Sequence, residues 1–258
     1  MNRITGLRYS ATNTYLIEGK KGMLLFDTGW AGTFPAFCHA LGEVKIPLQS
    51  IDYILISHFH PDHMGIAQEI AEHGPVIVLA EPQLEHVHDY DEVLLRDPKV
   101  DFHPVREDQA KVLPLAESRA FLRELGIDGE LLSTPGHSDD SITLALDDGT
   151  LFVGDLNPLY ELEMHRETQI GDSWEKLLAL SPKKIYYGHA RTEIRQDKDL
   201  YALVEKICSY IDKGYPLTKI VKKTGADPQF TEDVSRMYLT HQNVGVQGIL
   251  DRIEIKGK

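Results

Sequence analysis

The stretch Ser57-His58-Phe59-His60-Pro61-Asp62-His63 carries the clearest chemistry in this chain. Three imidazoles and one carboxylate fall between positions 58 and 63, directly after the apolar run 51–56. Imidazole nitrogens and carboxylate oxygens are donors that suit zinc, and also iron or manganese. The stretch therefore predicts a metal-binding cluster in a loop that follows a buried strand.

Three further donors stand where apolar, strand-like runs end. They are in the dipeptides Gly136-His137, Gly154-Asp155 and Gly188-His189. A glycine directly before each donor lets the backbone turn sharply and aim the side chain at a crowded centre. A single histidine at a strand end is usually a surface residue. Three such donors together with the cluster at 58–63 favour one shared metal site.

The order of these motifs resembles that of the metallo-β-lactamase-fold hydrolase superfamily, from about Tyr9 to Thr192. The motifs that carry the resemblance are Asp27-Thr28-Gly29, His58-x-His60-x-Asp62-His63, Gly136-His137, Gly154-Asp155 and Gly188-His189. The similarity is to the glyoxalase II-like and lactonase-like branch, because true β-lactamases of the best-known zinc subclass carry Cys where Asp155 stands. The resemblance implies an α/β fold, a four-layer αβ/βα sandwich of two mixed β-sheets flanked by helices.

The resemblance also implies a ligand set for two metal ions, expected to be zinc, with iron or manganese as alternatives. The implied ligands are His58, His60 and His137 for the first ion, Asp62, His63 and His189 for the second, and Asp155 as the bridge. Asp27 is expected to lie behind them and to accept a hydrogen bond from a ligand imidazole, which would fix its tautomer. A simple turn at the end of a strand stays the alternative for Asp27.

Two divalent cations beside two carboxylates leave a positive centre that lowers the pKa of a bridging water. Together with this chemistry, the resemblance implies a hydrolase whose hydroxide, bridging two metals, opens an ester, thioester or lactone of a small molecule. Asp62 and Asp155 are its expected catalytic residues, and Tyr160 is a candidate donor to a substrate oxygen, with a packing role as the alternative. A phosphodiesterase on the same site, or a sulfur dioxygenase with one iron on His58, His137 and Asp155, are the other hypotheses.

Composition narrows the partners of this 258-residue chain. A net charge of −13 disfavours nucleic acid, because phosphate binding depends on surplus Lys and Arg. No run has the length of a membrane span or a signal peptide, so we expect no membrane partner. Cys38 and Cys208 are expected to be free thiols in a reducing cytoplasm. A small-molecule substrate remains the expected partner.

Strands and helices that alternate in two similar halves must position these residues. The expected strands are 12–18, 22–26, 51–56, 75–80, 130–133, 142–146, 151–153 and 184–187, and the expected helices in this part are 34–41, 66–71 and 173–180. We expect a catalytic domain over residues 1–196, with 81–127 as a cap-like insertion. Residues 197–258 are expected to form a C-terminal helical extension packed on it, as a wall beside the substrate or as the contact of a homodimer.

Overall fold

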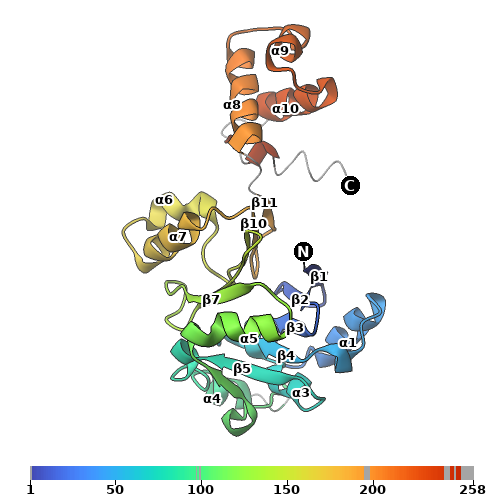
Figure 1. Ribbon diagram of the computed structural model, residues 1–258, viewed down its shortest axis with the longest axis vertical. Helices are drawn as coiled ribbons and strands as arrows, with labels where there is room; N and C mark the ends of the chain where they lie inside the picture. Colours follow the sequence, from blue (N-terminus) through green and yellow to red (C-terminus); the bar gives the residue numbers. More distant parts are fainter. Residues whose placement is uncertain are drawn as a thin grey trace. The chain divides into compact units, whose positions relative to one another are not determined.

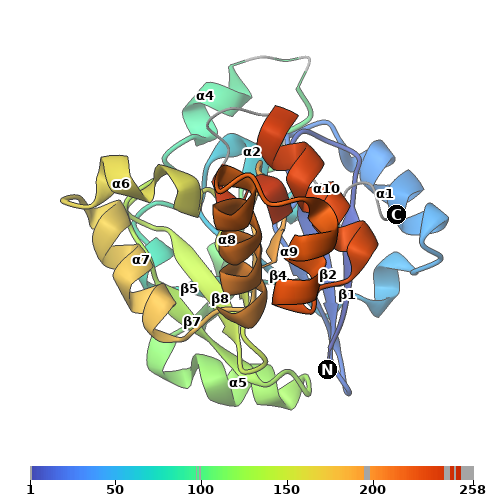
Figure 2. The ribbon, with the colours of Figure 1, turned by 90° about the horizontal axis from the view of Figure 1, so that it is seen from above.

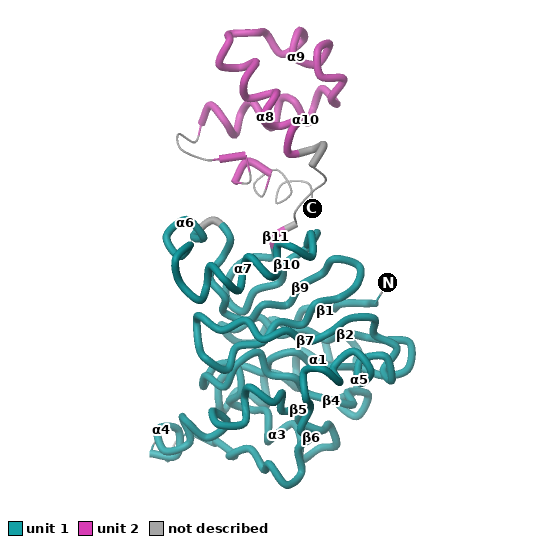
Figure 3. The backbone as a smooth tube through the Cα atoms, turned by 60° about the vertical axis from the view of Figure 1, so that its left-hand side comes forward, with its two compact units in different colours: residues 1–192 teal, residues 193–258 magenta. Residues whose placement is uncertain are grey.

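The structure, a computed structural model, describes residues 2–96, 98, 100–194, 198–240, 245–246 and 248–250. The chain divides into two compact units, residues 1–192 and residues 193–258 (Figure 3). The sequence placed this boundary after residue 196. No helix among the described residues is long and apolar enough to cross a membrane.

The first sheet of unit 1 has six strands that neighbour one another in chain order (Figure 1). They are β1 (Arg3–Leu7), β2 (Thr14–Glu18), β3 (Met23–Phe26), β4 (Tyr53–Leu55), β5 (Val76–Ala80) and β6 (Lys111–Leu113). The pairs β1–β2 and β2–β3 are antiparallel, whereas β3 to β6 run parallel. Parallel neighbours need a crossover connection, and helices α1 (Phe34–Glu43) and α3 (Ala67–Ala71) lie in two of these connections.

The second sheet places β10 (Lys184–Tyr186), β9 (Thr150–Phe152), β8 (Ile142–Leu146) and β7 (Gly129–Ser133) side by side. The pairs β7–β8 and β8–β9 are antiparallel, and β9–β10 is parallel. Helices α6 (Leu162–His165) and α7 (Gln169–Ala179) form the crossover from β9 to β10. Both sheets are therefore mixed, as expected.

Three apolar cores separate four layers. Along β3, Leu24 and Phe26 point into the core between the two sheets, whereas Leu25 packs on the opposite face in the same core as Phe37 of α1. Trp174 of α7 fills the core on the outer face of the second sheet together with Leu151. Figure 2 shows α1 and α7 on opposite sides of the strands. The expected αβ/βα sandwich is confirmed.

The segment expected to be a cap, 81–127, differs from the prediction in its second half. Strand β6 pairs with β5 at the edge of the first sheet, and Phe121 of α5 (Ser118–Glu124) lies in the core between the sheets. The first half holds α4 (Asp91–Leu95) and two short 3-10 helices, Glu81–Gln83 and Glu107–Gln109. Strand β6 was not predicted because Lys111 and Val112 are exposed, so the strand shows no apolar or alternating pattern in the sequence.

The described part of unit 2 includes the short strand β11 (Glu193–Ile194) and the helices α8 (Lys198–Asp212), α9 (Leu217–Thr224) and α10 (Pro228–Thr240). Their apolar faces form a core of their own that includes Val204, Ile207, Ile220 and Val234. Helix α9 ends at Thr224 and is capped by Gly225, whose φ of 70° favours glycine. The expected C-terminal helices are present.

Candidate metal centre

The loop between β4 and β5 brings the first cluster of donors together. After β4 ends at Leu55, the chain bends at Ser57 and His58 and is extended at His60, and Pro61 then begins the short helix α2 (Pro61–Met64). Proline favours the first position of a helix because its φ is already helical and it lacks the N–H that would be unpaired there. The change from extended to helical backbone lets His58, His60 and His63 converge instead of alternating across a strand.

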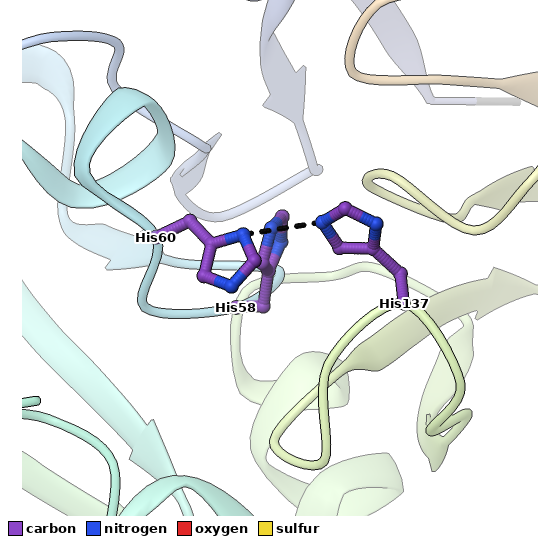
Figure 4. Close-up of side chains that lie close together, drawn as sticks. All are labelled: His58, His60 and His137. Atoms are coloured by element: carbon purple, nitrogen blue, oxygen red, sulfur yellow. Dashed lines mark hydrogen bonds between the residues drawn. The ribbon is translucent and has the colours of Figure 1, made fainter.

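The first group of candidate ligands consists of His58, His60 and His137 (Figure 4). Their candidate ligand atoms all lie within 4.8 Å of one another. His137 Nε2 is 3.1 Å from His60 Nδ1, and the ring of His58 is centred 4.4 Å from that of His60. His58 is buried, whereas His137 is exposed, so one face of this group is open.

The second group consists of Asp62, His63, Asp155 and His189, again with candidate ligand atoms within 4.8 Å of one another. His189 Nε2 lies 2.8 Å from Asp62 Oδ2 and 3.2 Å from Asp155 Oδ2. Asp155 Oδ1 lies 3.3 Å from His63 Nε2. Asp155 Oδ2 is also 3.7 Å from His137 Nε2, in the first group. The fold thus brings together every residue that the sequence proposed as a ligand.

The glycines before the strand-end donors act in two different ways. Gly136 and Gly154 have positive φ angles of 144° and 56°, so they make the sharp turns that we expected. Gly188 has no such angle. A Cβ there would lie 2.3 Å from Asp155 Oδ1 and 2.7 Å from His63 Cε1. Gly188 is therefore required because a side chain would fill the space where the donors meet.

Asp27 lies behind the second group, as expected. It is buried, and its Oδ2 accepts a hydrogen bond from His63 Nδ1 at 2.9 Å. Its Oδ1 accepts one from the backbone N–H of Ser57 at 2.7 Å. The bond to Nδ1 fixes the orientation of the His63 ring, so that Nε2 faces the centre.

Ser57 supports both groups and was missed by the sequence interpretation. Its hydroxyl lies 2.9 Å from Asp27 Oδ2 and 3.0 Å from His58 Nδ1. If the hydroxyl donates to the carboxylate, it accepts from His58 Nδ1–H, which leaves His58 Nε2 free to face the centre. Its place directly before His58 was the only signal in the sequence.

Thr12 is a second residue that the sequence did not single out. Its hydroxyl lies 2.8 Å from the carbonyl oxygen of Asp62 and 3.1 Å from Asp62 Oδ2. Thr12 is buried, so this contact holds the carboxylate in place. The two residues are 50 positions apart, and no pattern in the sequence links them.

The electrostatics of the two groups differ. Burial, followed by the neighbouring imidazoles, holds the pKa of His58 well below its usual 6.5. Burial also acts to lower the pKa of His63, but the carboxylates of Asp27 and Asp155 outweigh it and raise this pKa to about 10. Burial acts to raise the pKa of Asp155, yet the neighbouring imidazoles, His63 above all, lower it. The second group therefore favours positive charge between its carboxylates.

Unpartnered buried atoms show that the residues fit metal ions. His58 Nε2, His63 Nε2 and Asp155 Oδ1 are buried and have no hydrogen-bond partner. Buried polar atoms are normally paired, and these three come from segments far apart in the sequence. Imidazoles and carboxylates at this spacing match the donors that zinc, iron and manganese take.

A cavity of about 300 Å³ opens beside the centre. It is lined by His137, Asp155 and His189 of the two ligand groups, and also by Asn157 and Glu161. Tyr160, the expected donor to the substrate, lies in the 3-10 helix η5 (Leu159–Glu161). Its side chain lies outside the described part of the structure, so its role stays a prediction.

Comparison with known proteins agrees with this geometry. Residues 7–189 match the Metallo-beta-lactamase superfamily. A relative in Drosophila melanogaster, "Beta-lactamase-like protein 2 homolog", is 33% identical over 194 residues, which are 72% of this chain and 63% of the fly protein. "Atrochrysone carboxyl ACP thioesterase" of Claviceps purpurea is 26% identical over 153 residues, 57% of this chain and 40% of that protein. The chain thus spans less than two thirds of either relative.

Solved structures share the fold. A metallo-beta-lactamase family protein from Thermus thermophilus superposes with a TM-score of 0.57 at 18% identity, covering 99% of this chain and 94% of that one. The protein TTHA1623, solved in a di-iron-bound form, gives a TM-score of 0.54 at 24% identity, covering 75% and 94%.

Proposed function

The chain belongs to the metallo-beta-lactamase superfamily, and from this premise we propose that it is a dinuclear metal-dependent hydrolase that opens an ester, thioester or lactone of a small molecule. One observation carries the proposal. The carboxylate of Asp155 lies 3.3 Å from His63 in the second ligand group and 3.7 Å from His137 in the first. A carboxylate in this position is suited to bridge two cations.

The ligand roles follow the two groups. His58, His60 and His137 would hold the first ion, Asp62, His63 and His189 the second, and Asp155 both. Bound zinc, or iron or manganese in its place, supplies hydroxide at neutral pH and polarises the carbonyl oxygen of the substrate. The di-iron form of TTHA1623 supports iron as the alternative to zinc.

Other side chains are proposed to orient the metal ligands and to transfer a proton. Asp27 and Ser57 hold the Nδ1 atoms of His63 and His58, so that both Nε2 atoms face the centre. Asp62, held by Thr12, is proposed to pass a proton to the leaving oxygen or sulfur.

An ester-type bond is favoured over the two alternatives. None of the described residues that line the cavity is Lys or Arg, whereas phosphoryl groups are commonly held by such cations. The second ligand group offers four candidate donors of its own, which favours two ions over the single iron of a sulfur dioxygenase. The thioesterase of Claviceps purpurea supports a thioester or ester as substrate.

Metal analysis and a substrate panel test the proposal together. We expect about two metal ions per chain, and hydrolysis of 4-nitrophenyl esters, alkyl thioesters or lactones with a higher kcat/KM than for bis(4-nitrophenyl) phosphate. His39→Ala removes an exposed imidazole on α1 and should change neither result. One iron per chain with oxygen uptake, or faster cleavage of the phosphodiester, would overturn the proposal.

A further inference from the structure

The cavity beside the metal centre contains one carboxylate that belongs to neither ligand group, that of Glu161. The other described lining residues outside the ligand groups are uncharged: Gly154, Leu156, Asn157, Pro158, Tyr187 and Ala190. Among the described residues that line the cavity, no Lys or Arg balances the charge of Glu161.

Glu161 is half-buried and has a neutral partner. Its Oε2 accepts a hydrogen bond from Asn157 Nδ2 at 2.9 Å. Within the described part of the chain, no Lys, Arg or His forms an ion pair with it. A partly desolvated carboxylate is stabilised most by a cation that donates hydrogen bonds to it.

The backbone around Glu161 is fixed against the second sheet's covering helix. The indole N–H of Trp174 in α7 donates to the carbonyl oxygen of Asn157 at 2.7 Å, and Trp174 is fully buried. The N–H of Glu161 donates to the carbonyl oxygen of Pro158 at 2.8 Å. These bonds hold the carboxylate in place before any ligand enters, which reduces the entropy lost on binding.

We propose that Glu161, oriented by Asn157, binds a positively charged N–H group of the substrate, so that the enzyme acts on cationic esters or thioesters such as those that carry a protonated amine. This specificity rests on the proposed hydrolysis at the adjacent centre. An anionic group at the same place would meet the like charge of Glu161. Glu161 is thus a specificity-determining residue and takes no part in bond cleavage.

Matched thioesters measure the effect of the charge alone. The cationic probes are the thioacetates of 2-(dimethylamino)ethanethiol and of its homologues with longer spacers, and the neutral isostere of the first is 3-methylbutyl thioacetate. Released thiol is followed with a chromogenic disulfide. For the best spacer, we expect the metal-replete enzyme to favour the cation in kcat/KM by about 10-fold or more, the usual effect of a charged hydrogen bond.

Glu161→Gln should remove this preference and leave kcat/KM for the neutral thioester within about threefold, because the amide keeps the shape but loses the charge. Glu161→Lys should reverse the preference. The matched control is Glu163→Gln, an exposed carboxylate two positions along the chain, which should leave the preference intact. An unchanged preference in Glu161→Gln, or an equal loss for both thioesters, would overturn the inference.

A binding measurement separates this inference from the proposed function. N-[2-(dimethylamino)ethyl]acetamide and N-(3-methylbutyl)acetamide serve as resistant analogues in calorimetry with the metal-replete protein. If no ester, thioester or lactone is hydrolysed but the cationic amide binds about 10-fold more weakly to Glu161→Gln than to wild type, the recognition site stands and the proposed function fails. Equal binding of both amides by both proteins overturns the recognition site alone.

Discussion

The two ligand groups of the centre are built from different donors. The first has three imidazoles, whereas the second pairs two imidazoles with two carboxylates. Accordingly, the pKa of buried His58 lies well below its usual value, while that of equally buried His63 is raised to about 10. At equal burial, the neighbouring carboxylates decide the direction of the shift. The second group should therefore attract a cation more strongly, and it must also release a proton to bind one.

The largest effect should come from Asp155, the residue proposed to bridge the two groups. Asp155→Ala should reduce the metal content of both groups and lower kcat/KM by at least about 10³-fold, since both ions lose a ligand and the chemistry depends on them. Elemental analysis and an ester assay would check this. Asp139→Ala, an exposed carboxylate in the loop after His137, is the control. Loss of only one ion would show that Asp155 does not bridge.

Replacing a ligand that belongs only to the first group should remove metal from that group and leave the second group occupied. His60→Ala should bring the metal content close to one ion per chain and reduce turnover by about 10²-fold or more. Because His60 lies in a loop outside the apolar cores, we expect the free energy of unfolding of the chelator-treated protein to change by less than about 1 kcal/mol. Full activity in this variant would remove His60 from the ligand set.

Asp27 contacts His63 but not His58, so its replacement should act on one group. Asp27→Asn should weaken metal binding in the second group by about 10- to 100-fold and leave the first group nearly unchanged. Metal titration with competing chelators gives the two affinities. Ser57→Ala removes a contact to His58 and to Asp27. This variant should weaken metal binding in both groups, each by less than Asp27→Asn weakens the second. Equal effects of the two variants on the two metal affinities would contradict the inference that Asp27 acts on the second group alone.

The smallest effect concerns the stability of chelator-treated protein against pH. The pKa of His63 is raised from 6.5 to about 10 in the folded state, so its stabilisation is fully present below pH 6.5 and is lost as pH rises through about 10. The pKa of His58 is lowered, so this residue destabilises the fold as pH falls below 6.5. Urea denaturation between about pH 5 and 10 should show that the free energy of unfolding falls toward both the acid and the alkaline end. Asp27→Asn should make the fall of this free energy at alkaline pH less steep. An unchanged alkaline slope would contradict the inference that Asp27 raises the pKa of His63.

Much of this architecture follows from local sequence. The strands around the metal motifs were predicted to within a few residues, and β8 (Ile142–Leu146) was predicted at its observed bounds, because buried strands carry continuous apolar runs. Strands β1 and β6 were not predicted. Each lies at an edge of the first sheet with much of its length exposed, so main-chain pairing defines it and no apolar pattern marks it.

The sequence by itself determined which residues supply donors, since imidazoles, carboxylates and the glycines before them are visible as letters. Only the tertiary structure decided how they meet. Asp155 reaches both groups, Ser57 joins His58 to Asp27, and Glu161 shares a cavity with His189 because strand ends and loops far apart in the chain converge when two sheets pack face to face. Contacts of this kind depend on the packing of the sheets, so local sequence patterns do not predict them.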